Sequence, residues 1–424
     1  MWRAARRVVV PATAVTTVAC WYTAYKYRPR GSWEVDYHKA VEENPELAQP
    51  NKVEAKLIDL ARYFAVWPVG IAERALMRIL NRSEIIDHEK LTRFVDPAAR
   101  DGRAMVTVAN HVSTLDDPFL VTRLLPPSVF INPRLLRWSV CSEELCFFND
   151  AIGTFFGVGR VIPITRGGGI LQPSLDTVAG KVREGQWVHF FPEGRVWQEG
   201  GLPLRDDDGR WCSVTGRCSL PFAKVGPIKW GIGRVIANAP KPPIVVPIFH
   251  LGLENVVPQD FKNDVKSMIP KIGNRITAKV GDPVPVEDLI DAYFAKAAER
   301  AAAREERREA LRRRGKPLPP PASHPAAGEG VGDEFESEVK AEAEVAARSD
   351  GKPHWQQHHF HAGLRIKPPD HELLTEEQAL EEEAVRLKLY SAISQRLWAA
   401  LAGLEADVRE YRRSTLGVEE KEQR

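Results

Sequence analysis

Five short apolar runs, separated by helix-like stretches, constrain the fold more than any other feature of the sequence. The runs are Ala104–Ala109, Val161–Ile164, Trp187–Phe191, Ile244–Phe249 and Ile276–Val280. They are rich in β-branched residues and almost free of polar alternation, which is typical of strands covered on both faces by helices. The sequence therefore predicts an α/β fold.

The composition changes along the chain and predicts four parts. We expect a membrane-anchor or targeting segment at residues 1–30 and an α/β domain with its own N-terminal helices at residues 50–295. Residues 296–370 form a charged, Pro-rich insertion, which we expect to begin as a solvated Ala/Glu/Arg helix through Arg314 and to continue as disorder. A helical pattern returns at residues 371–415, and we expect this helix to pack on the core.

Two segments have the character of membrane-contacting elements, although a mean hydropathy of −0.31 excludes a polytopic membrane protein. The run Val8–Tyr25 is mostly apolar, with basic residues on both sides, and is typical of a single anchor, an interfacial helix or a mitochondrial targeting segment. A disordered tail is the alternative. The segment Val53–Leu80 predicts helix interrupted by Pro68. It fits a helix lying on a bilayer, with Arg62, Arg74 and Arg78 toward the headgroups, and equally a core helix.

Charge and cysteine content exclude several classes of function. Lys and Arg total 59 against 57 for Asp and Glu, a net charge of +2, so we predict no nucleic-acid partner. The five cysteines show no CxxC pair and no zinc-ligand spacing, which argues against a disulfide scaffold and a zinc site. The cluster from His354 to His361 lacks carboxylate support, so we predict no metal site.

His111 and Asp116 form the strongest candidate for catalysis. They directly follow the run that ends at Ala109, and reactive groups in α/β folds lie at strand ends. A turn into a helix would fold the carboxylate back on the imidazole, which fixes the tautomer and makes the ring a general base for a hydroxyl. A satisfied loop histidine beside a helix N-cap is the alternative. No GxSxG nucleophile motif occurs in the chain, so an acyl-enzyme is not expected.

Two further strand ends carry candidate substrate-binding residues. Arg166 follows one run and precedes Gly167–Gly169, where an arginine and glycine amides suit a phosphate. Glu193, Gly194 and Arg195 follow another run: the carboxylate suits a substrate hydroxyl or the orientation of a base, and the glycine leaves room for a phosphate or an oxyanion. A plain surface turn is the alternative.

The fourth run continues to His250 and is expected to form a wall of the site rather than to supply a reagent. It contains Pro247, which predicts an edge strand or a bulge.

The order of these blocks resembles the four motifs of the glycerolipid acyltransferase family. The family pattern is HxxxxD, a strand ending in Arg-Gly, FPEG and a hydrophobic VPI strand, and all four occur here. The stretches Cys141–Gly168, Trp187–Val196 and Lys229–Arg234 resemble the mitochondrial branch that exchanges acyl chains between phospholipids. The resemblance implies a mixed β-sheet flanked by helices, a catalytic His111–Asp116 dyad and substrates that enter from the bilayer surface.

Relatives that make phosphatidate commonly continue FPEG with Thr-Arg, whereas Arg195 and Val196 follow here. This departure weakens the case for lysophosphatidate as acceptor, although Arg195 still suits a phosphate. The insertion at residues 296–370 is not a feature of the family core.

The residues and the resemblance together imply a transacylase that remodels cardiolipin without coenzyme A or any other cofactor. His111 would deprotonate the hydroxyl of a lysophospholipid such as monolysocardiolipin, and the oxygen would attack an ester of a second phospholipid such as phosphatidylcholine. The expected location is a mitochondrial membrane, outer or inner, facing the intermembrane space. Attachment would be peripheral or through a single anchor, and a homo-oligomer is compatible with the sequence.

Three alternatives remain open at this stage. A coenzyme A-dependent acyltransferase would use the same dyad. A soluble hydrolase would use His111 to activate water, but the membrane-facing segments would then be unexplained. A membrane scaffold without activity belongs to a different class, and the presence of His111, Asp116, Glu193 and Gly194 argues against it.

Overall fold

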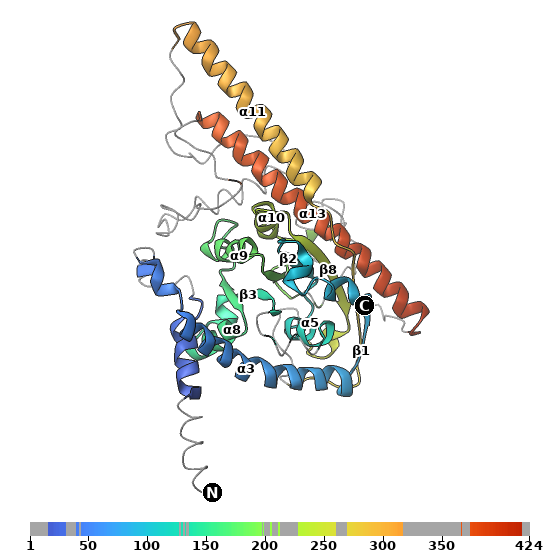
Figure 1. Cartoon of the computed structure of the whole chain (residues 1–424). Coiled ribbons are helices and arrows are strands. Elements are labelled where there is room, and N and C mark those ends of the chain that lie inside the picture. The colour runs from blue at the N-terminus through green and yellow to red at the C-terminus, as the bar shows by residue number, and fades with distance from the viewer. Residues whose placement is uncertain are drawn as a thin grey trace.

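A computed structural model describes residues 16–30, 40–41, 44–126, 129, 132, 135–196, 198, 204–205, 211–212, 228–259, 269–316, 366 and 374–417. Its centre is a seven-stranded sheet of strand order β1-β9-β8-β2-β5-β3-β4 (Figure 1). The strands are β1 (Arg82–Ile86), β2 (Met105–Ala109), β3 (Trp138–Ser142), β4 (Val161–Ile164), β5 (Trp187–Phe190), β8 (Ile244–Leu251) and β9 (Arg275–Val280). Strands β2, β3, β4, β5 and β8 run parallel to one another, whereas β9 is antiparallel to β8 and pairs in parallel with β1. The expected mixed α/β sheet is confirmed.

Helices cover both faces of this sheet. The longer ones are α3 (Lys52–Ala75), α5 (Asp116–Leu124), α8 (Asp150–Val158), α9 (Pro173–Arg183), α11 (Glu287–Arg313) and α13 (Glu376–Ser414). The shorter elements are the helices α4 (Glu89–Thr92), α7 (Glu143–Cys146) and α10 (Gly231–Ala237), the π turn η2 (Leu76–Leu80), the 3-10 turns η1 (Pro45–Ala48), η3 (Pro97–Arg100) and η5 (Leu253–Asn255), and the small pair β6 (Leu204–Arg205) and β7 (Trp211–Cys212).

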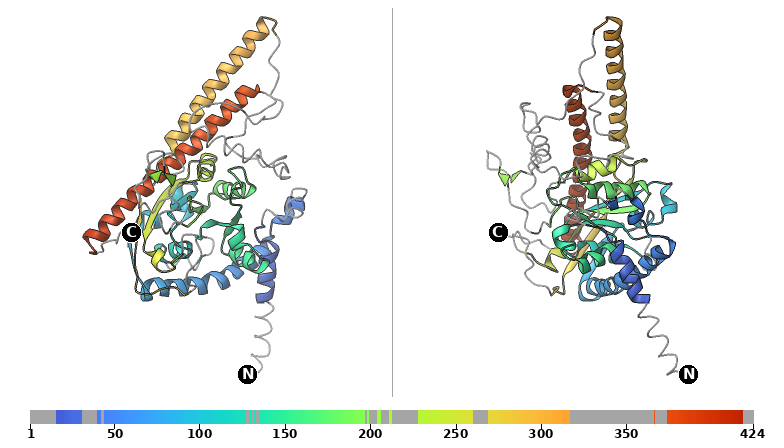
Figure 2. Two further views of the ribbon diagram at one scale, coloured as in Figure 1. Left: turned by 180° about the vertical axis from the view of Figure 1, so that it is seen from behind. Right: turned by 90° about the vertical axis from the view of Figure 1, so that its left-hand side faces the viewer.

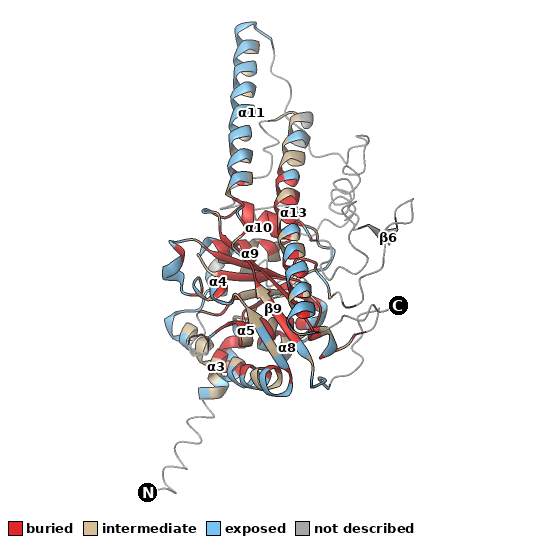
Figure 3. Ribbon diagram, turned by 90° about the vertical axis from the view of Figure 1, so that its right-hand side faces the viewer, coloured by how far each residue is buried: buried red, intermediate tan, exposed pale blue. Residues whose placement is uncertain are grey.

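Alternate side chains of the central strands point into two apolar layers, which explains why the strand sequences lack polar alternation. Val106 and Phe249 belong to the layer under α9, α10 and α13. Met105 and Val246 belong to the layer that includes α5. The strands at the centre of the molecule are accordingly buried throughout (Figure 3).

Strand β8 corrects one expectation, because Pro247 lies in an interior strand between β9 and β2 rather than at an edge. In β8, Ile244 N–H donates toward β2, whereas Val245 O accepts from Val284 N–H on the other side. The ring nitrogen of Pro247 therefore faces the β9 side. The pairing with β9 begins only at Ile248, so the proline removes no bond from that ladder.

The block Lys229–Arg234 has a structural role at the contact of α10 with α13. A Cβ at Gly233 would lie 2.2 Å from Tyr390 O, so only glycine permits this approach of the two helices. The buried Arg234 pairs with Asp176 Oδ1 of α9 at 2.5 Å. These contacts dock the C-terminal helix on the sheet, as its apolar pattern predicts.

Helix α11 places Ile290 in the core near its N-terminus and continues through the Ala/Glu/Arg tract to Arg313, where its side chains are exposed or half-buried. It lies beside the N-terminal part of α13, and both project beyond the sheet (Figures 1 and 2). Arg300 and Arg304 of α11 pair with Glu382 of α13. The disorder expected for most of the remaining insertion falls on residues 317–365 and 367–370, outside the described residues.

Helix α3 buries small and polar residues and leaves several of its large apolar residues exposed. Ala61 and Ala65 pack against Cys20 and Ala24 of the helical residues 16–26. The large apolar residues of α3 that stay exposed are Val53, Phe64, Trp67, Val69 and Ile71. The helix runs through Pro68 without breaking into a pair. Within the described part of the chain, no helix combines the length and hydrophobicity needed to cross a bilayer. Residues 1–15 of the expected anchor are outside that part.

Two of the three arginines expected to face headgroups are used inside the protein. Arg62 is buried, and its Nε donates to Val158 O at the C-terminal end of α8 at 2.8 Å. Arg74 Nη1 donates to Thr122 O near the end of α5 at 2.8 Å. Both cations thus neutralise helix C-termini. Arg78 is exposed.

A disulfide in the described residues joins Cys141 of β3 to Cys146 of α7, with their Cα atoms 6.0 Å apart. The two cysteines are only five positions apart in the sequence, so this bridge does not form a scaffold of the kind that the sequence argued against. Cys20 is free and buried.

Replacing Gly233 by alanine should destabilise the fold by about 1–3 kcal/mol, because the new methyl group overlaps Tyr390 O and forces α10 away from α13. The matched control is Gly403→Ala in α13, where no atom lies within 4 Å of the added carbon. That variant should be neutral or more stable by up to about 1 kcal/mol, because alanine has the higher helix propensity. Urea unfolding measures both, and equal stabilities for the two variants would contradict the packing assigned to Gly233.

Candidate active site

The candidate residues gather where the parallel strands end. His111 follows β2, Arg166 follows β4, Glu193 follows β5 and His250 lies near the end of β8. Since these strands are parallel, their C-terminal ends share one edge of the sheet. Ligand sites of open α/β sheets form at that edge.

His111 and Asp116 form a hydrogen-bonded dyad. His111 Nδ1 donates to Asp116 Oδ2 at 2.8 Å, and the backbone N–H groups of Val112 and Ser113 donate to the same oxygen at 2.7 and 2.8 Å. Asp116 is the first residue of α5 and is fully buried, so the helix dipole also favours its charge. The imidazole is 21% exposed. This hydrogen bond fixes the Nδ1–H tautomer and leaves Nε2 as the basic nitrogen.

Aromatic packing fixes the plane of the His111 ring. Phe191 stacks on it, with ring centroids 4.2 Å apart and an interplanar angle of 19°. His189 in turn packs edge-on against Phe191 at 4.5 Å. The imidazole is thus held both by a hydrogen bond at Nδ1 and by a stacked ring, a geometry that could serve a general base.

Glu193 lies beside the dyad rather than on the surface. It is 2% exposed, and its Oε2 accepts the backbone N–H of His111 at 3.4 Å. The structure thus brings the FPEG turn of β5 against the residue that carries the base. Gly194 and Arg195 are exposed next to it, and Gly194 has a φ of +72°, which favours glycine.

Arg166 and the glycines after it form an exposed turn at the other side of the sheet edge. Gln172 holds this turn: its Oε1 accepts Thr165 N–H at 2.9 Å, and its Nε2 donates to Gly169 O at 2.9 Å. Gly167 and Gly169 have φ of +72° and +69° with open space around them. Strands β2 and β4 are separated by β5 and β3, so Arg166 starts roughly 14 Å from the β2 strand end, at about 4.8 Å per strand.

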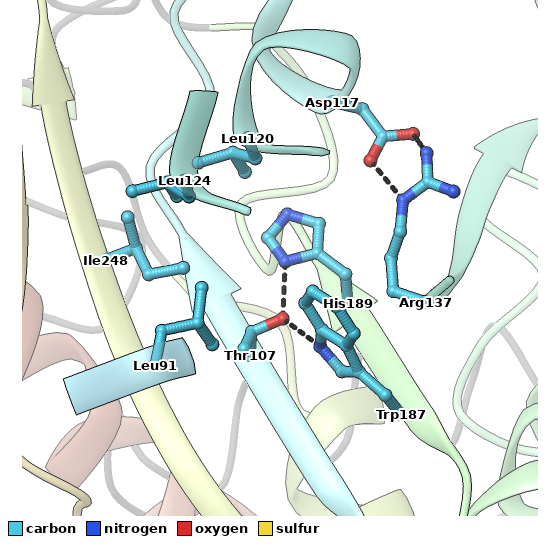
Figure 4. A pocket seen from close by; sticks show the side chains of 9 residues that line it. All are labelled: Leu91, Thr107, Asp117, Leu120, Leu124, Arg137, Trp187, His189 and Ile248. Carbon is cyan, nitrogen blue, oxygen red and sulfur yellow. Dashed lines mark hydrogen bonds and ion pairs between the residues drawn. The ribbon is translucent and has the colours of Figure 1, made fainter. Parts of the chain in front are cut away.

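A group of largely buried polar residues lies behind the dyad, and sequence reasoning missed it. Asp117 pairs with Arg137 through both carboxylate oxygens, which ties α5 to β3 (Figure 4). Burial opposes the charge of Asp117, but Arg137, His189 and the hydroxyl of Ser139 outweigh it and hold the pKa of Asp117 below its usual value. These residues are about 20 or more positions apart in the sequence, so no local pattern could reveal them.

Thr107 of β2 links this strand to its neighbour β5 through two side-chain hydrogen bonds (Figure 4). Its hydroxyl accepts Trp187 Nε1–H at 2.8 Å and shares a hydrogen bond of 2.8 Å with His189 Nδ1. Burial lowers the pKa of His189 to about 3, so this histidine is neutral at physiological pH. With Asp117 and Arg137, these side chains form the polar wall of a small cavity whose other wall is apolar.

Glu73 is a further buried carboxyl group near the dyad. It lies on the inner side of α3 and is 6% exposed. Burial, and to a lesser degree the charge of Asp116, raises the pKa of Glu73 to about 7. Within the described residues, no group of three or more His, Cys, Asp or Glu side chains is arranged to hold a metal ion.

The buried Glu73 should make the protein less stable as the pH rises. The folded protein retains a proton that the unfolded chain releases near pH 4.5, so stability falls between that value and about pH 7. From pH 5 to pH 8, the native protein should lose about 2–3 kcal/mol more stability than Glu73→Gln. Urea unfolding at the two pH values measures this difference. If both proteins lost the same stability between the two pH values, the pKa of Glu73 would not be raised.

Comparisons with known proteins identify a family model and relatives that match this chain. The Acyltransferase family model matches residues 83–250, from β1 through the dyad to β8. N-acylphosphatidylethanolamine synthase of Arabidopsis thaliana is 31% identical over 225 residues, which are 53% of this chain and 71% of that protein. Tafazzin of Drosophila melanogaster is 30% identical over 58% of this chain and 56% of its own length. Taffazin of Dictyostelium discoideum is 34% identical over 48% and 63%, respectively.

The chain therefore spans little more than half of the two tafazzin relatives and over two thirds of the Arabidopsis protein. The matched region holds the strands of the central sheet other than β9, together with both members of the dyad. With its family model and a relative aligned over most of its own length, the chain belongs to the glycerolipid acyltransferase family.

Proposed function

We propose that this phospholipid acyltransferase is a transacylase that remodels the acyl chains of cardiolipin without coenzyme A. The observation that carries the proposal is the His111–Asp116 dyad at the end of β2, in a chain about 30% identical to tafazzins. The dyad provides a base for a hydroxyl group. Among the described residues, no Ser, Thr or Cys side chain that could act as a nucleophile is hydrogen-bonded to His111.

The reaction that this geometry supports is a direct transfer between two lipids. His111 Nε2 takes the proton from the free hydroxyl of monolysocardiolipin, and Asp116 stabilises the imidazolium that forms. The hydroxyl oxygen attacks an ester carbonyl of a second phospholipid such as phosphatidylcholine and gives a tetrahedral oxyanion. Its collapse breaks the original ester bond, and His111 returns the proton to the departing lysophospholipid. One ester forms as another breaks, so the step needs no activated acyl donor.

Backbone N–H groups at the two glycine turns are the candidates for stabilising the oxyanion. Gly194 directly follows Glu193, whose carboxylate accepts the backbone N–H of His111, so this turn lies close to the dyad. The N–H of Gly194 donates to Phe191 O at 3.1 Å, and it must share or exchange that bond to reach an oxyanion.

The turn at residues 167–169 is farther along the sheet edge and suits a phosphate group of a lipid. Arg166 begins this turn, and Arg195 follows the turn nearer the dyad. In the proposed reaction, these two arginines bind the lipid headgroups through their phosphates.

Membrane attachment in this proposal is peripheral or through a single N-terminal anchor, on a mitochondrial membrane and facing the intermembrane space. The exposed Phe64, Trp67 and Ile71 of α3 support contact with a bilayer surface. Near the N-terminus, the exposed Val18 and Tyr22 support the same contact. A homo-oligomer is compatible with these surfaces.

A second candidate reaction has an amine as the acceptor. The Arabidopsis relative is named for the synthesis of N-acylphosphatidylethanolamine and aligns over a larger share of its length than the two tafazzins do. The same base would deprotonate the headgroup amine of phosphatidylethanolamine, and the product would be an amide instead of an ester. The chemical stability of the product separates the two reactions, since alkali cleaves esters but spares amides.

His111→Ala should lower the rate of acyl transfer by about 10²–10⁴-fold, because it removes the general base. The matched control is His88→Ala, since His88 is 61% exposed and pairs only with its neighbour Glu89 among the described residues. That variant should transfer acyl chains at the native rate. Circular dichroism establishes that both variants are folded, and native turnover by folded His111→Ala would rule out the dyad mechanism.

Transfer without coenzyme A is the second test of the proposal. Purified protein is added to bilayers that contain phosphatidylcholine with a labelled acyl chain, monolysocardiolipin and phosphatidylethanolamine. We expect label in cardiolipin, in an alkali-labile ester, without any coenzyme A species. Label that appears only when acyl-CoA is supplied would assign the protein to the coenzyme A-dependent acyltransferases. Label in an alkali-stable amide would favour the amine acceptor.

A further inference from the structure

Only one of the two oxygens of the Asp116 carboxylate accepts hydrogen bonds from the described residues. Oδ2 accepts hydrogen bonds from His111, Val112 and Ser113. Oδ1 is buried as well, but no atom among the described residues donates a hydrogen bond to it. A buried carboxylate oxygen without a donor is unfavourable, so this atom points to a missing contact.

His250 provides the nitrogen that faces this oxygen. Its Nε2 lies 3.9 Å from Asp116 Oδ1, beyond hydrogen-bonding distance by about 1 Å. The ring is fully buried, and neither of its nitrogens has a hydrogen-bond partner among the described residues. Two buried polar atoms without partners thus lie opposite each other, and the oxygen concerned is the one that does not bind His111.

The fold holds His250 at this place through its backbone. Asn110, the residue before His111, donates from Nδ2 to His250 O at 2.9 Å and accepts His250 N–H at Oδ1 at 3.0 Å. This double hydrogen bond joins the end of β8 to the end of β2. Phe119 of α5 packs against the imidazole, with ring centroids 6.0 Å apart. The two hydrogen bonds between the Asn110 side chain and the His250 backbone therefore fix the position of His250 relative to the dyad.

His250 is a neutral imidazole in these surroundings. Burial lowers its pKa below the usual value for histidine, with a further lowering by His111, and this outweighs the raising effects of Asp116, Glu254 and the backbone of Asn110. A neutral imidazole carries one N–H group. The Nε2–H tautomer can donate to Asp116 Oδ1, whereas the Nδ1–H tautomer cannot.

We propose that His250 is a positioning residue for acyl transfer, whose Nε2–H donates to Asp116 Oδ1 and holds the carboxylate so that Oδ2 stays directed at His111. The proposal rests on the proposed function only in that acyl transfer uses the dyad. Catalytic hydrogen bonds are often long without substrate and shorten in the substrate complex, and a shift of about 1 Å would close this one. The strand β8 then contributes more than a wall to the site.

This contact would matter most when His111 carries the proton of the acceptor hydroxyl. The charge of Asp116 must then stay aligned with the imidazolium. Without a donor at Oδ1, the carboxylate is held through Oδ2 alone. Its alignment with His111 is then less tightly fixed, and the hydrogen bond between them weakens. Losing one hydrogen bond to a charged group lowers a rate by about 10- to 100-fold.

Three substitutions of His250 test the proposal. Glutamine places an amide nitrogen near the position of Nε2, whereas asparagine places one near the position of Nδ1. Phenylalanine keeps a ring of similar shape and removes both nitrogens. We expect His250→Gln to keep a kcat close to the native value. His250→Asn and His250→Phe should lose about 10- to 100-fold in kcat with an unchanged KM.

Thermal unfolding of the three variants separates positioning from a general effect on the fold. If His250 has only a structural role, kcat should fall in proportion to the loss of thermal stability. His250→Asn and His250→Gln should then not differ in kcat beyond their difference in unfolding temperature. Activity is measured with whichever acyl donor the native protein uses, so a coenzyme A-dependent result would overturn the proposed function and leave this test intact. Equal kcat for His250→Gln and His250→Asn, or native kcat for His250→Phe, would overturn the role of His250.

A second measurement does not depend on turnover. Nitrogen-15 NMR of labelled histidine reports the tautomer of His111 in the folded protein in detergent. We expect the Nδ1–H tautomer in the native protein and in His250→Gln, and a mixture of tautomers in His250→Asn and His250→Phe. An unchanged His111 tautomer in all the variants would overturn the proposal even if no acyl transfer were observed.

Discussion

Asp116 carries a charge into the interior at the first turn of α5, and the arrangement of the site depends on how that charge is held. The N–H groups of Val112 and Ser113 can reach it only if the chain turns sharply after β2. The same turn places His111 where its Nδ1 donates to the carboxylate. Burial alone would disfavour this charge, and the helix N-terminus and the hydrogen bonds offset that cost.

The dyad is surrounded by groups that titrate abnormally. His189 and His250 have lowered pKa values because they are buried, and Glu73 has a raised one for the same reason. The two histidines are therefore uncharged near neutral pH, and Glu73 is partly protonated there, so together they add less charge beside Asp116 than exposed groups of the same kind would. Helix α3 connects this interior to the surface, because it directs Glu73 inward while Phe64 and Trp67 are exposed on the same helix. The proposed membrane contact and the buried Glu73 near the dyad thus share one element.

The sequence predicted those parts of the structure that follow from local pattern. The strands β2, β4, β5, β8 and β9 are runs of apolar residues, and HxxxxD after a strand identified the dyad residues, whose hydrogen bond the structure contains. Strand β1 was missed because its sequence RSEII is polar and partly exposed at the sheet edge. Strand β3 was missed because serines interrupt its apolar residues.

Long-range contacts explain the remaining differences. Pro247 predicted an edge strand or a bulge. It lies in an interior strand instead, and it removes no hydrogen bond because the pairing of β8 with β9 begins only at Ile248. Arg62 would face headgroups only if its helix lay on a bilayer surface, one of two alternatives left open by the sequence, and in the structure it binds a carbonyl of α8, 96 residues away. Glu73 and His250 come to the dyad from α3 and from the end of β8, and nothing in their local sequence distinguishes them from ordinary core positions. Buried titratable groups of this kind become visible only when the strands are paired.

In the proposed reaction, the acceptor lipid attacks the donor ester directly, and the protein is never acylated. Rapid-quench mass spectrometry of the intact protein mixed with phosphatidylcholine alone tests it. We expect the protein mass to stay unchanged and no burst of lysophosphatidylcholine to form until monolysocardiolipin is added. A protein heavier by one acyl chain, formed fast enough to lie on the reaction path, would contradict it.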